Sequence, residues 1–293
     1  MLHPHNITIL GAGAFGTALR SVLEQGKATV CSWDIVPGPR VEMDLDVALS
    51  TSPHLIIAVG AQHVRSVCLR MCNTPHGPEH IWIASKGIEK DTGMVLSDVV
   101  ASIVPHAVVG VMSGPNIAQE MVDGHGCGMT LACACPASLA MAQSWWRHTP
   151  VMTETTPDIV GVQLLGALKN VIAIGYGLLE QTTPSTNMHA TYLGLAMAEV
   201  ARLMKQCGGA PTTQMTYAGW PDLVVSCAKG RNRMFGKTFP CHDTSRPEGV
   251  DTTHGLVKKM GNAMADYPIL NTICAIVHNT MPIDALPAAM HRS

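Results

Sequence analysis

ITILGAGAFG, residues 7–16, is the stretch that decides how the first half of this chain folds. An apolar run leads directly into G-x-G-x-x-G, whose glycines are Gly11, Gly13 and Gly16, and a helical pattern follows. In such a setting the first glycine forms a tight turn, the second lets the backbone approach a pyrophosphate, and the third lets the helix pack against the strand. The helix start offers free N–H groups to phosphates. The stretch predicts a dinucleotide-binding turn; a glycine-rich turn without a ligand is the alternative.

The second apolar run ends at Trp33-Asp34, and the acid lies 18 residues after Gly16. A carboxylate about 20 residues beyond the motif hydrogen-bonds a ribose 2′-hydroxyl and repels a 2′-phosphate. Asp34 therefore favours NAD over NADP as the cofactor. The alternative is a surface aspartate that begins a loop.

Short apolar runs alternate with helical patterns through the first 150 residues. The runs do not alternate between apolar and charged residues, which is typical of parallel strands buried on both faces. Right-handed crossovers between such strands give a doubly wound sheet. The predicted strands are Ile7–Leu10, Ala28–Trp33, Leu55–Val59, Ile81–Ala84 and Ala107–Met112, the helices are Ala14–Gln25, Gln62–Met71 and Gly93–Val104, and Gly128–Cys133 could extend the sheet.

From about residue 155 the strand patterns give way to helical ones. Pro150 and Pro157 bracket the change. We therefore expect an α/β protein with two domains, a Rossmann-type doubly wound parallel sheet in residues 1–155 and an all-helical domain in residues 156–293. The helices predicted in the second domain are Ile159–Leu179, Met188–Gln206, Asp251–Met260 and Ile269–His278.

The composition narrows the class of protein. Of the 293 residues, 47% are apolar and 14% are charged, against a usual charged share of about 25%. Such a chain is not intrinsically disordered. A net charge of −2 with 19 Lys and Arg gives no basic footprint for nucleic acid. The low charge favours a subunit interface.

No segment predicts membrane insertion or export. Val162–Leu179 is interrupted by Gln163, Lys169 and Asn170, so it falls short of about 18 clean apolar residues. The start, MLHPHNITIL, has no basic region and no long apolar region typical of a secretory signal. Ten cysteines without a C-x-x-C predict reduced thiols in a cytoplasmic protein. The four-residue step from Cys68 to Cys72 and the pair Cys133 and Cys135 could hold a metal. No second ligand pair has zinc-site spacing, so we expect no metal.

Several segments in order resemble the NAD-dependent glycerol-3-phosphate dehydrogenase family over nearly the whole chain. The segments are GAGAFGTAL (11–19), ASKGIE (84–89), SGPNIAQE (113–120), ALKNVIAIGYG (167–177), PDLVVSCAKGRNRMFG (221–236) and EGVDT (248–252). The resemblance implies hydride transfer between NAD(H) and a small phosphorylated alcohol or ketone. Its leading pair is sn-glycerol 3-phosphate and glycerone phosphate, in glycerol phosphate metabolism and phospholipid biosynthesis, and it implies a homodimer.

Lys169 lies within an otherwise apolar helical pattern. It shares one face with Val162, Leu165, Ile172 and Tyr176, and the opposite face is apolar too, so the helix is predicted to be buried. A buried ammonium must be paired or used in chemistry, and burial lowers its pKa toward the range useful for proton transfer. The resemblance makes Lys169 the general acid of the reduction and the base of the reverse reaction. A lysine that snorkels to the helix rim is the alternative.

Two further charged residues complete the predicted catalytic group. By the resemblance, Asp222 is the carboxylate that pairs with Lys169; an aspartate before an apolar run is also a standard helix N-cap, and both interpretations stay open. Lys86 follows the run 81–84, at the carboxyl edge of the sheet, where ligands of such sheets bind. The resemblance places Lys86 near substrate and nicotinamide. A solvated loop lysine is the alternative.

The resemblance also assigns residues to the substrate phosphate and the cofactor. Arg231 and Asn232, in GRNR, match the family's phosphate clamp, since a guanidinium can bind two phosphate oxygens and an amide adds a donor. Gly230 leaves the approach clear, and Arg231 also reaches the cofactor. The other substrate positions are Gly114, Asn116, Asn170 and Ser226, and the other cofactor positions are Ala14, Phe15, Ala118 and Glu248. The alternatives are a surface acid at Glu248 and a solvated basic loop made of Lys229, Arg231, Arg233 and Lys237.

The chain departs from the family pattern in three places, of which the third bears on the substrate. The region between Asp34 and Leu55 is shorter than in typical relatives, and Gly60 stands where they have proline. The stretch PSTNMHATYLGLAMAE (184–199) keeps Asn187 but lacks the family's acid and has Gly194 in place of an arginine. This predicts an altered pocket wall. It motivates one alternative, a related dehydrogenase for another phosphorylated or acidic substrate in specialised metabolism. A second alternative is a catalytically inactive NAD-binding sensor, against which the retention of Lys169, Asp222 and Arg231 argues.

Overall fold

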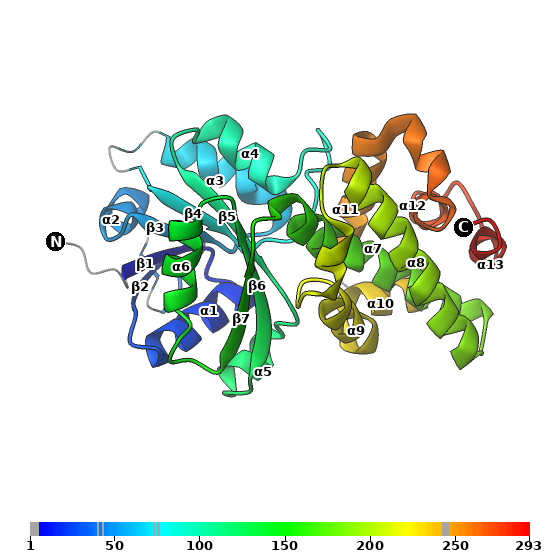
Figure 1. Cartoon of the computed structure of the whole chain (residues 1–293), viewed down its shortest axis with the longest axis horizontal. Coiled ribbons are helices and arrows are strands. Elements are labelled where there is room, and N and C mark those ends of the chain that lie inside the picture. The colour runs from blue at the N-terminus through cyan, green and yellow to red at the C-terminus, as the bar shows by residue number, and fades with distance from the viewer. Residues whose placement is uncertain (1–5, 40, 43, 73, 75–76, 242–245) are drawn as a thin grey trace.

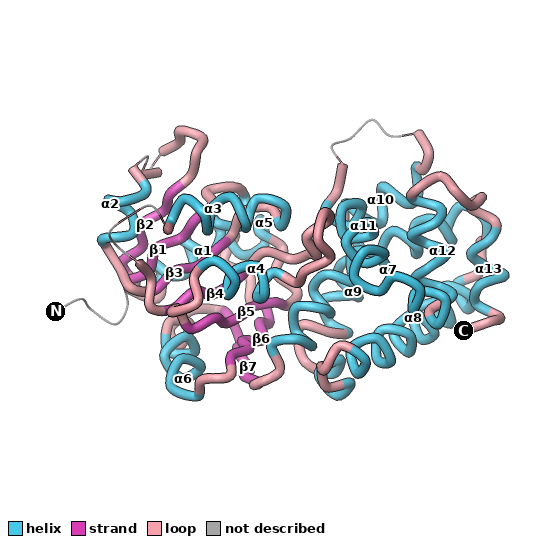
Figure 2. Tube along the Cα trace, turned by 90° about the horizontal axis from the view of Figure 1, so that it is seen from above, coloured by secondary structure: helices cyan, strands magenta, loops and turns pink. Residues whose placement is uncertain are grey.

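The computed structural model describes residues 6–39, 41–42, 44–72, 74, 77–241 and 246–293. Residues 1–5, which form half of the predicted non-secretory start, lie outside the described residues. Figure 1 shows a sheet flanked by helices at the N-terminal end of the long axis and a group of helices at the C-terminal end. Among the described residues, strands are confined to the first of these two halves (Figure 2).

A seven-stranded sheet forms the first half, in the order β2-β1-β3-β4-β5-β6-β7. All neighbouring strands are parallel except β5 and β6, which are antiparallel. The strands are β1 (Asn6–Leu10), β2 (Thr29–Trp33), β3 (His54–Ile57), β4 (His80–Ile83), β5 (Val108–Ser113), β6 (Cys127–Cys133) and β7 (Val151–Thr156). The predicted doubly wound α/β class is confirmed.

Two details of the sheet differ from the prediction. The β5–β6 pair breaks the all-parallel pattern. Strand β7 was not predicted, because its sequence VMTETT carries a charge and four hydroxyl or acidic side chains. An edge strand has one neighbour and need not be apolar on both faces, so the polar residues of β7 are compatible with its position at the end of the sheet.

Helices cover both faces of the sheet because successive strand residues point to opposite sides. One face carries Leu10, Leu55 and Ile57, which pack with helices α2 (Leu45–Ser50), α3 (Val64–Met71) and α4 (Leu96–Ile103). The other face carries Ile9, Ile56 and Trp82, which pack with α1 (Ala14–Gln25), α5 (Ala118–Val122) and α6 (Pro136–Ser144). Helix α1 has the predicted bounds.

The chain winds in one direction from β1 to β2 and in the other from β3 onward, so the order reverses between β1 and β3. The loops after these two strands meet there. Gly11 has φ +110°, and a Cβ on it would lie 2.7 Å from the carbonyl carbon of Ala58. Open α/β sheets bind ligands in the crevice at such a point, outside the carboxyl ends of the strands.

Helix α7 (Ile159–Thr182) is the central element of the second half. It begins after β7 and packs mainly within one apolar cluster, whereas Val162 near its start packs with residues of the sheet half. It is long and apolar enough to cross a membrane by composition, but 78% of its apolar window is buried inside the protein, as the core helix of a folded domain would be. Around it lie α8 (Thr186–Gln206), α9 (Trp220–Lys229), α10 (Arg231–Thr238), α11 (Glu248–Met260), α12 (Pro268–Val277) and α13 (Ala285–Met290), with short 3-10 turns at Ala61–His63, Pro211–Met215 and Gly261–Asp266.

A buried carboxylate caps helix α12. The side chain of Glu199 on α8 is fully buried, and its two oxygens accept hydrogen bonds from the backbone N–H groups of Ile269 (2.8 Å) and Leu270 (2.9 Å). Burial raises the pKa of the Glu199 carboxyl. The carboxylate supplies acceptors that the start of a helix otherwise lacks.

Replacing this cap should destabilise the protein. We expect Glu199→Ala to lower the free energy of unfolding by about 2–4 kcal/mol, because two buried N–H groups lose their acceptors. Glu199→Gln keeps one acceptor oxygen and should cost less. The measurement is the urea unfolding midpoint, with exposed Glu79→Ala as the control expected within about 0.5 kcal/mol of the parent. Equal stability of Glu199→Ala and the control would contradict the capping role.

Candidate active site

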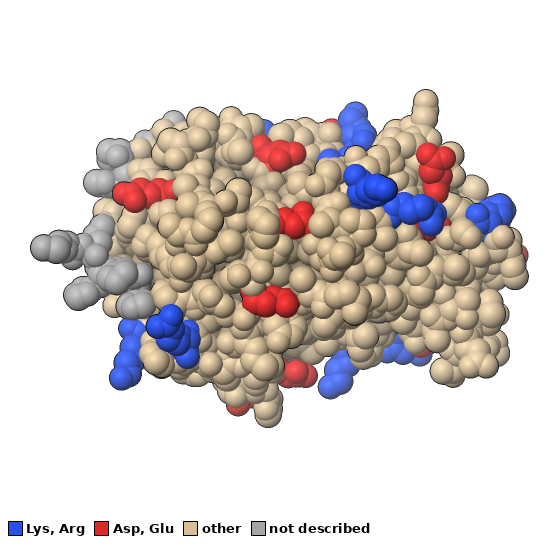
Figure 3. All heavy atoms as spheres, viewed as in Figure 1, with Lys and Arg blue, Asp and Glu red and all other residues tan. Residues whose placement is uncertain are grey.

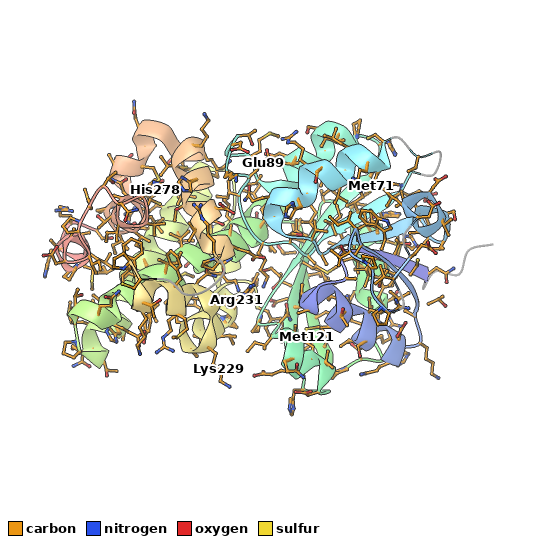
Figure 4. The ribbon with its side chains drawn as sticks, turned by 180° about the vertical axis from the view of Figure 1, so that it is seen from behind. Met71, Glu89, Met121, Lys229, Arg231 and His278 are labelled. Carbon is orange, nitrogen blue, oxygen red and sulfur yellow. The ribbon has the colours of Figure 1, made fainter. Side chains whose placement is uncertain are left out.

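Two cavities meet at the loops where the strand order reverses. The larger, of about 920 Å³, lies between the sheet and the helical half; the smaller, of about 300 Å³, lies beside the end of β2. Both are lined by Gly13 and by the turn Ala58–Gly60. Figure 4 places Arg231 of α10 on the helical side of the boundary and Met121 of α5 on the sheet side.

The three glycines of the turn have different structural roles. A Cβ on Gly16 would lie 1.8 Å from the carbonyl oxygen of Gly11, so only glycine lets α1 approach the turn. A Cβ on Gly13 would meet nothing within 4 Å. Gly13 is also the N-cap of α1 and provides no side-chain cap. The open space and the uncapped N–H groups at this point fit the pyrophosphate of a dinucleotide. Ala14 and Phe15 line the larger cavity beside it.

Asp34 lines the smaller cavity. Its Oδ2 accepts a hydrogen bond from the backbone N–H of Ala12 (2.7 Å), and its Oδ1 accepts one from the N–H of Val36 (3.1 Å). The carboxylate is therefore held at the end of β2 by the glycine-rich turn itself. This is the position at which an acid reaches a ribose 2′-hydroxyl.

Two lysines share one buried carboxylate in the larger cavity. Lys169 Nζ lies 2.5 Å from Asp222 Oδ1 and donates to Ser226 Oγ at 3.0 Å. Lys86 Nζ lies 2.7 Å from Asp222 Oδ2 and donates to the carbonyl oxygen of Gly114 at 2.9 Å. The Asp222 side chain is 2% exposed. One negative charge thus fixes two ammonium groups beside the cavity.

The surrounding backbone explains how these three side chains meet. Lys169 lies on α7, Lys86 follows β4, and Asp222 lies in the first turn of α9. A Cβ on Gly166, one turn before Lys169, would lie 2.9 Å from Ser113 Oγ and 3.6 Å from Lys86 Cγ. The glycine therefore leaves room for Lys86 to cross α7.

The structure decides between the alternatives for this group. The N-cap of α9 is Gly219, so the interpretation of Asp222 as an N-cap is wrong. The side chain of Lys169 is 11% exposed and ends on Asp222, so it does not snorkel to solvent. Lys86 is 14% exposed and paired, which excludes a solvated loop lysine.

Burial lowers the pKa of Lys169 to about 8 from an ordinary value of 10.5. Asp222 raises this pKa by attraction, and the neighbouring charge of Lys86 lowers it again. A lysine with a pKa near neutrality can both give and accept a proton under physiological conditions.

The GRNR run forms the junction of two helices. Arg231 is the first residue of α10, is exposed, and lines the larger cavity. No hydrogen bond or ion pair joins it to another residue in the described part of the chain. Asn232 donates from Nδ2 to Asn170 Oδ1 (2.9 Å) and accepts from the N–H of Gly249 (2.9 Å). The amide thereby ties α10 to α7 and to the start of α11.

The structure excludes one alternative for this run and shows a further reason for Gly230. Arg233 forms a bidentate pair with Glu180, at 2.6 and 2.8 Å, so the basic residues do not form a merely solvated loop. Gly230 ends α9 and caps α10, and a Cβ on it would lie 2.3 Å from the carbonyl oxygen of Ser226. The close approach of the chain to itself requires this glycine, whether or not a ligand needs the room.

The remaining predicted positions fall mostly on the larger cavity. Asn116 donates to the carbonyl oxygen of Gly128 (2.8 Å), and its Oδ1 is buried with no partner among the described residues. Gly114 contributes its carbonyl to Lys86 and, like Gly16, does not line either cavity. The predicted residues that line the larger cavity are Gly13, Ala14, Phe15, Lys86, Asn116, Ala118, Lys169, Asn170, Asp222, Ser226, Gly230, Arg231, Asn232 and Glu248.

The altered stretch 184–199 does not form part of this wall. No described residue of α8 lines the larger cavity. Asn187 and Gly194 are exposed, and a Cβ on Gly194 would meet nothing within 4 Å. The buried face of α8 packs into the helical core, so the expected change in the pocket wall is wrong.

Other lining residues were not predicted. Lys229, Gln119 and Glu120 lie around the larger cavity, and Ser113 Oγ lies 3.5 Å from Asp222 Oδ2. Two signals in the sequence could have indicated further residues of the site. Ser113 directly precedes Gly114, and Gly166 lies three residues before Lys169 on the same helix. The described ranges hold no group of three or more His, Cys, Asp or Glu suited to a metal ion.

Sequence models of one family match both halves of the chain. The model described as NAD-dependent glycerol-3-phosphate dehydrogenase N-terminus matches residues 38–139, and that of the C-terminus matches residues 158–288. Glycerol-3-phosphate dehydrogenase [NAD(P)+] of Gluconobacter oxydans is 30% identical over 310 residues, covering 96% of this chain and 94% of the relative. The enzyme of the same name from Baumannia cicadellinicola is 33% identical over 261 residues, covering 79% and 76%.

Solved structures share the fold. A glycerol-3-phosphate dehydrogenase from Coxiella burnetii superposes with a TM-score of 0.85 at 24% identity, covering 98% of each chain. One from Saccharomyces cerevisiae gives a TM-score of 0.83 at 20% identity, covering 98% of this chain and 99% of the other. Both have the same arrangement of a sheet half followed by a helical half.

Proposed function

This chain belongs to the NAD-dependent glycerol-3-phosphate dehydrogenase family, and we propose that it interconverts sn-glycerol 3-phosphate and glycerone phosphate with NAD(H). The observation that carries the proposal is the Lys169–Asp222–Lys86 group, which shares one cavity with Arg231. That cavity continues to the glycine-rich turn. It combines a proton donor, a phosphate ligand and a dinucleotide site.

The cofactor supplies the hydride in the reduction and accepts it in the reverse reaction. The turn at Gly13 and the start of α1 would hold its pyrophosphate, and Asp34 would hold the adenosine ribose. Ala118 and Glu248, which line the larger cavity, would lie along its nicotinamide half.

Lys169 holds the proton that the reduction needs. Its Nζ donates this proton to the carbonyl oxygen of the substrate as that oxygen gains charge, and recovers it in the oxidation. Asp222 fixes the position of Nζ through the 2.5 Å contact. Lys86 is held by Asp222 and Gly114 and adds a second positive charge beside the same oxygen. Fixed charges in a site of low polarity stabilise developing charge without reorganisation.

Arg231 positions the substrate by its phosphate. It stands at the uncapped N-terminus of α10, where backbone N–H groups and a guanidinium both favour an anion. Asn232 and Asn170 form the adjoining wall. Binding energy from the phosphate thereby orients the carbonyl toward Lys169.

The activity assay is loss of absorbance at the NADH band with glycerone phosphate. We expect oxidation of NADH that depends on the ketone and reverses with sn-glycerol 3-phosphate and NAD. Binding of NADH without turnover of this substrate would contradict the proposal. A screen of other phosphorylated ketones would then separate a dehydrogenase of different specificity from an inactive sensor.

Three wider features belong to the same proposal. The division into domains 1–155 and 156–293 is supported by the strands, which end at Thr156, and by α7, which begins at Ile159. A homodimer is supported by the low charged fraction and by a face on which Lys, Arg, Asp and Glu are sparse (Figure 3). We place the protein in the cytoplasm, in glycerol phosphate metabolism that feeds phospholipid biosynthesis, on the resemblance and the unpaired cysteines.

A further inference from the structure

A second group of reactive side chains lies at the edge of the sheet opposite to the larger cavity. Strand β6 runs antiparallel to β5, so its last residue, Cys133, lies near the amino ends of the parallel strands. His80 is the first residue of β4 and pairs with His54, the first residue of β3. Cys135 lies between β6 and α6, which packs against the sheet (Figure 1). Two thiols and two imidazoles therefore gather at an edge that the proposed dehydrogenase reaction does not use.

Cys135 is the N-cap residue of α6. Pro136 has no N–H, and the first helical hydrogen bond runs from the N–H of Leu139 to the carbonyl oxygen of Cys135 (3.0 Å). The N–H groups of Ala137 and Ser138 thus have no acceptor within the helix, and they face the position of the N-cap side chain. The Ser138 hydroxyl, together with the N–H groups of Ser138 and Ala137, lowers the pKa of the Cys135 thiol. This thiol is partly exposed, so a small solute can reach it as a thiolate.

Cys133 is placed to react with a modified Cys135. It is 1% exposed, and burial raises the pKa of its thiol, so it stays protonated and away from solvent. The chain bends at Ala134, and the N–H of Cys135 donates to the Cys133 sulfur at 3.4 Å. Residues two positions apart have Cα atoms within about 7 Å of each other, which is the limit for a disulfide. One thiol of the pair therefore meets solvent, and the other lies behind it within bonding range.

Polar contacts connect this pair to the two histidines. Ser138 Oγ and His80 Nδ1 share a hydrogen bond of 3.1 Å, and the ring centroids of His80 and His54 lie 5.2 Å apart. His54 is 8% exposed, and its buried Nδ1 has no hydrogen-bond partner among the described residues. A buried polar atom without a protein partner indicates that a small polar molecule enters the cluster. Imidazoles also give and accept protons near neutral pH.

We propose that Cys135 is a modification site for hydroperoxides and that Cys133 converts the oxidised Cys135 into a disulfide. In the first step the Cys135 thiolate attacks one peroxide oxygen. An S–O bond forms, the O–O bond breaks, and the leaving hydroxide or alkoxide takes up the proton that the thiol had released. The sulfur loses two electrons, and the peroxide gains them. In the second step the Cys133 sulfur attacks the sulfenic sulfur, the S–S bond forms, the S–O bond breaks, and the Cys133 proton leaves with the hydroxide as water.

Oxidation of the full chain by hydrogen peroxide compares this site with other cysteines of the same molecule. Cys72 and Cys241 are exposed, whereas Cys135 is only partly exposed. A reactivity that followed exposure alone would oxidise Cys72 and Cys241 first. We expect the Cys135 thiol to be lost about tenfold faster than either, because the thiolate is the reacting form. Alkylation of the remaining thiols and mass spectrometry of the peptides measure each rate.

Variants of the two cysteines separate the two steps. In the parent protein, peroxide should produce a disulfide between Cys133 and Cys135 that dithiothreitol reverses. Cys133→Ser should instead accumulate a sulfenic acid at Cys135, which a 1,3-diketone traps. Cys135→Ser should form neither product and should leave Cys133 reduced.

The pH profile of alkylation tests the role of Ser138 as a positioning residue. Ser138→Ala should raise the pH at which the rate of reaction of Cys135 with iodoacetamide is half-maximal, because the thiolate loses a donor. Ser138→Thr keeps the hydroxyl and should stay near the parent profile. Cys72, on α3, is the control in every variant and should keep its midpoint.

Three results would contradict the inference. Oxidation of Cys72 or Cys241 at the rate of Cys135 would overturn the modification site. A sulfenic acid that persists at Cys135 in the parent protein, without a disulfide, would remove Cys133 from the second step. Equal alkylation midpoints for Cys135 and Cys72 would show that the start of α6 does not activate the thiol. None of these measurements depends on the turnover of glycerone phosphate, so they are independent of the proposed dehydrogenase activity.

Discussion

Lys169→Met should lower kcat for the reduction of glycerone phosphate by about 10³-fold, within the range of 10²–10⁴ typical of general acid catalysis. Methionine fills a similar volume but carries no proton. Asp222 retains its contact with Lys86 in this variant, so the buried carboxylate is not left without a partner. Binding of NADH, followed by its fluorescence, should change by less than about twofold because the glycine-rich turn is untouched.

The pH dependence distinguishes loss of the proton donor from a structural effect. The pKa of Lys169 is about 8, and the reduction needs the protonated form. kcat/KM for reduction should therefore fall as the pH rises through about 8, whereas kcat/KM for oxidation should rise through the same range, since it needs the neutral amine. Lys169→Met should show neither limb in its residual activity. Exposed Lys205→Met at the end of α8 should keep both, and a variant at position 169 that retained them would remove Lys169 from the proton-transfer role.

Arg231→Ala should raise the KM for glycerone phosphate by about 10²-fold, because it removes a charged ligand of the phosphate. The effect on kcat should be smaller. The N–H groups of α10 and the Asn232–Asn170 wall stay in place. Arg231→Lys should recover part of the affinity but not all, since an ammonium cannot bind two oxygens in one plane.

The matched measurement for Arg231 uses dihydroxyacetone, which lacks the phosphate. The parent protein and Arg231→Ala should reduce this poor substrate at similar rates, whereas they should differ strongly with the phosphorylated ketone. The control is Lys237→Ala. Lys237 lies on α10, as Arg231 does, is half-exposed, and lies 4.0 Å from Glu180 of α7. This variant should leave both rates near those of the parent. An equal loss with both substrates would show that Arg231 acts on the fold of α10 or on the cofactor instead.

The glycine motif and the apolar periodicity correctly predicted the elements whose structure depends on their own residues. The strand–turn–helix at residues 7–25 follows from glycine geometry and apolar periodicity, and α1 has the predicted bounds. The burial of α7 follows from its two apolar faces. Strand β7 was missed because its pairing with β6, and not its own polar sequence, makes it a strand.

The sequence indicated which residues belong to the candidate site, but it did not indicate how their side chains meet. The helix face of Lys169 indicated a buried ammonium, and the resemblance indicated its partner. That Lys86 shares the same carboxylate depends on Gly166, which lets two chain segments 80 residues apart approach. The assignment of 184–199 to the pocket wall was wrong because the sequence does not show which face of α8 packs into the helical core and whether any face reaches the cavity.

The three glycines of the turn, Gly11, Gly13 and Gly16, meet two different requirements, close packing within the protein and access for a ligand. Gly11 and Gly16 are required by contacts within the protein itself, whereas the backbone at Gly13 is extended and its side-chain space is empty. A helix N-cap selected for folding alone favours serine, threonine, aspartate or asparagine. In a chain that no longer bound a ligand, one of these four residues at position 13 would cap the start of α1 and stabilise it. Glycine at position 13 leaves the N–H groups at the start of α1 without a side-chain acceptor, and the phosphates of a bound dinucleotide would supply one.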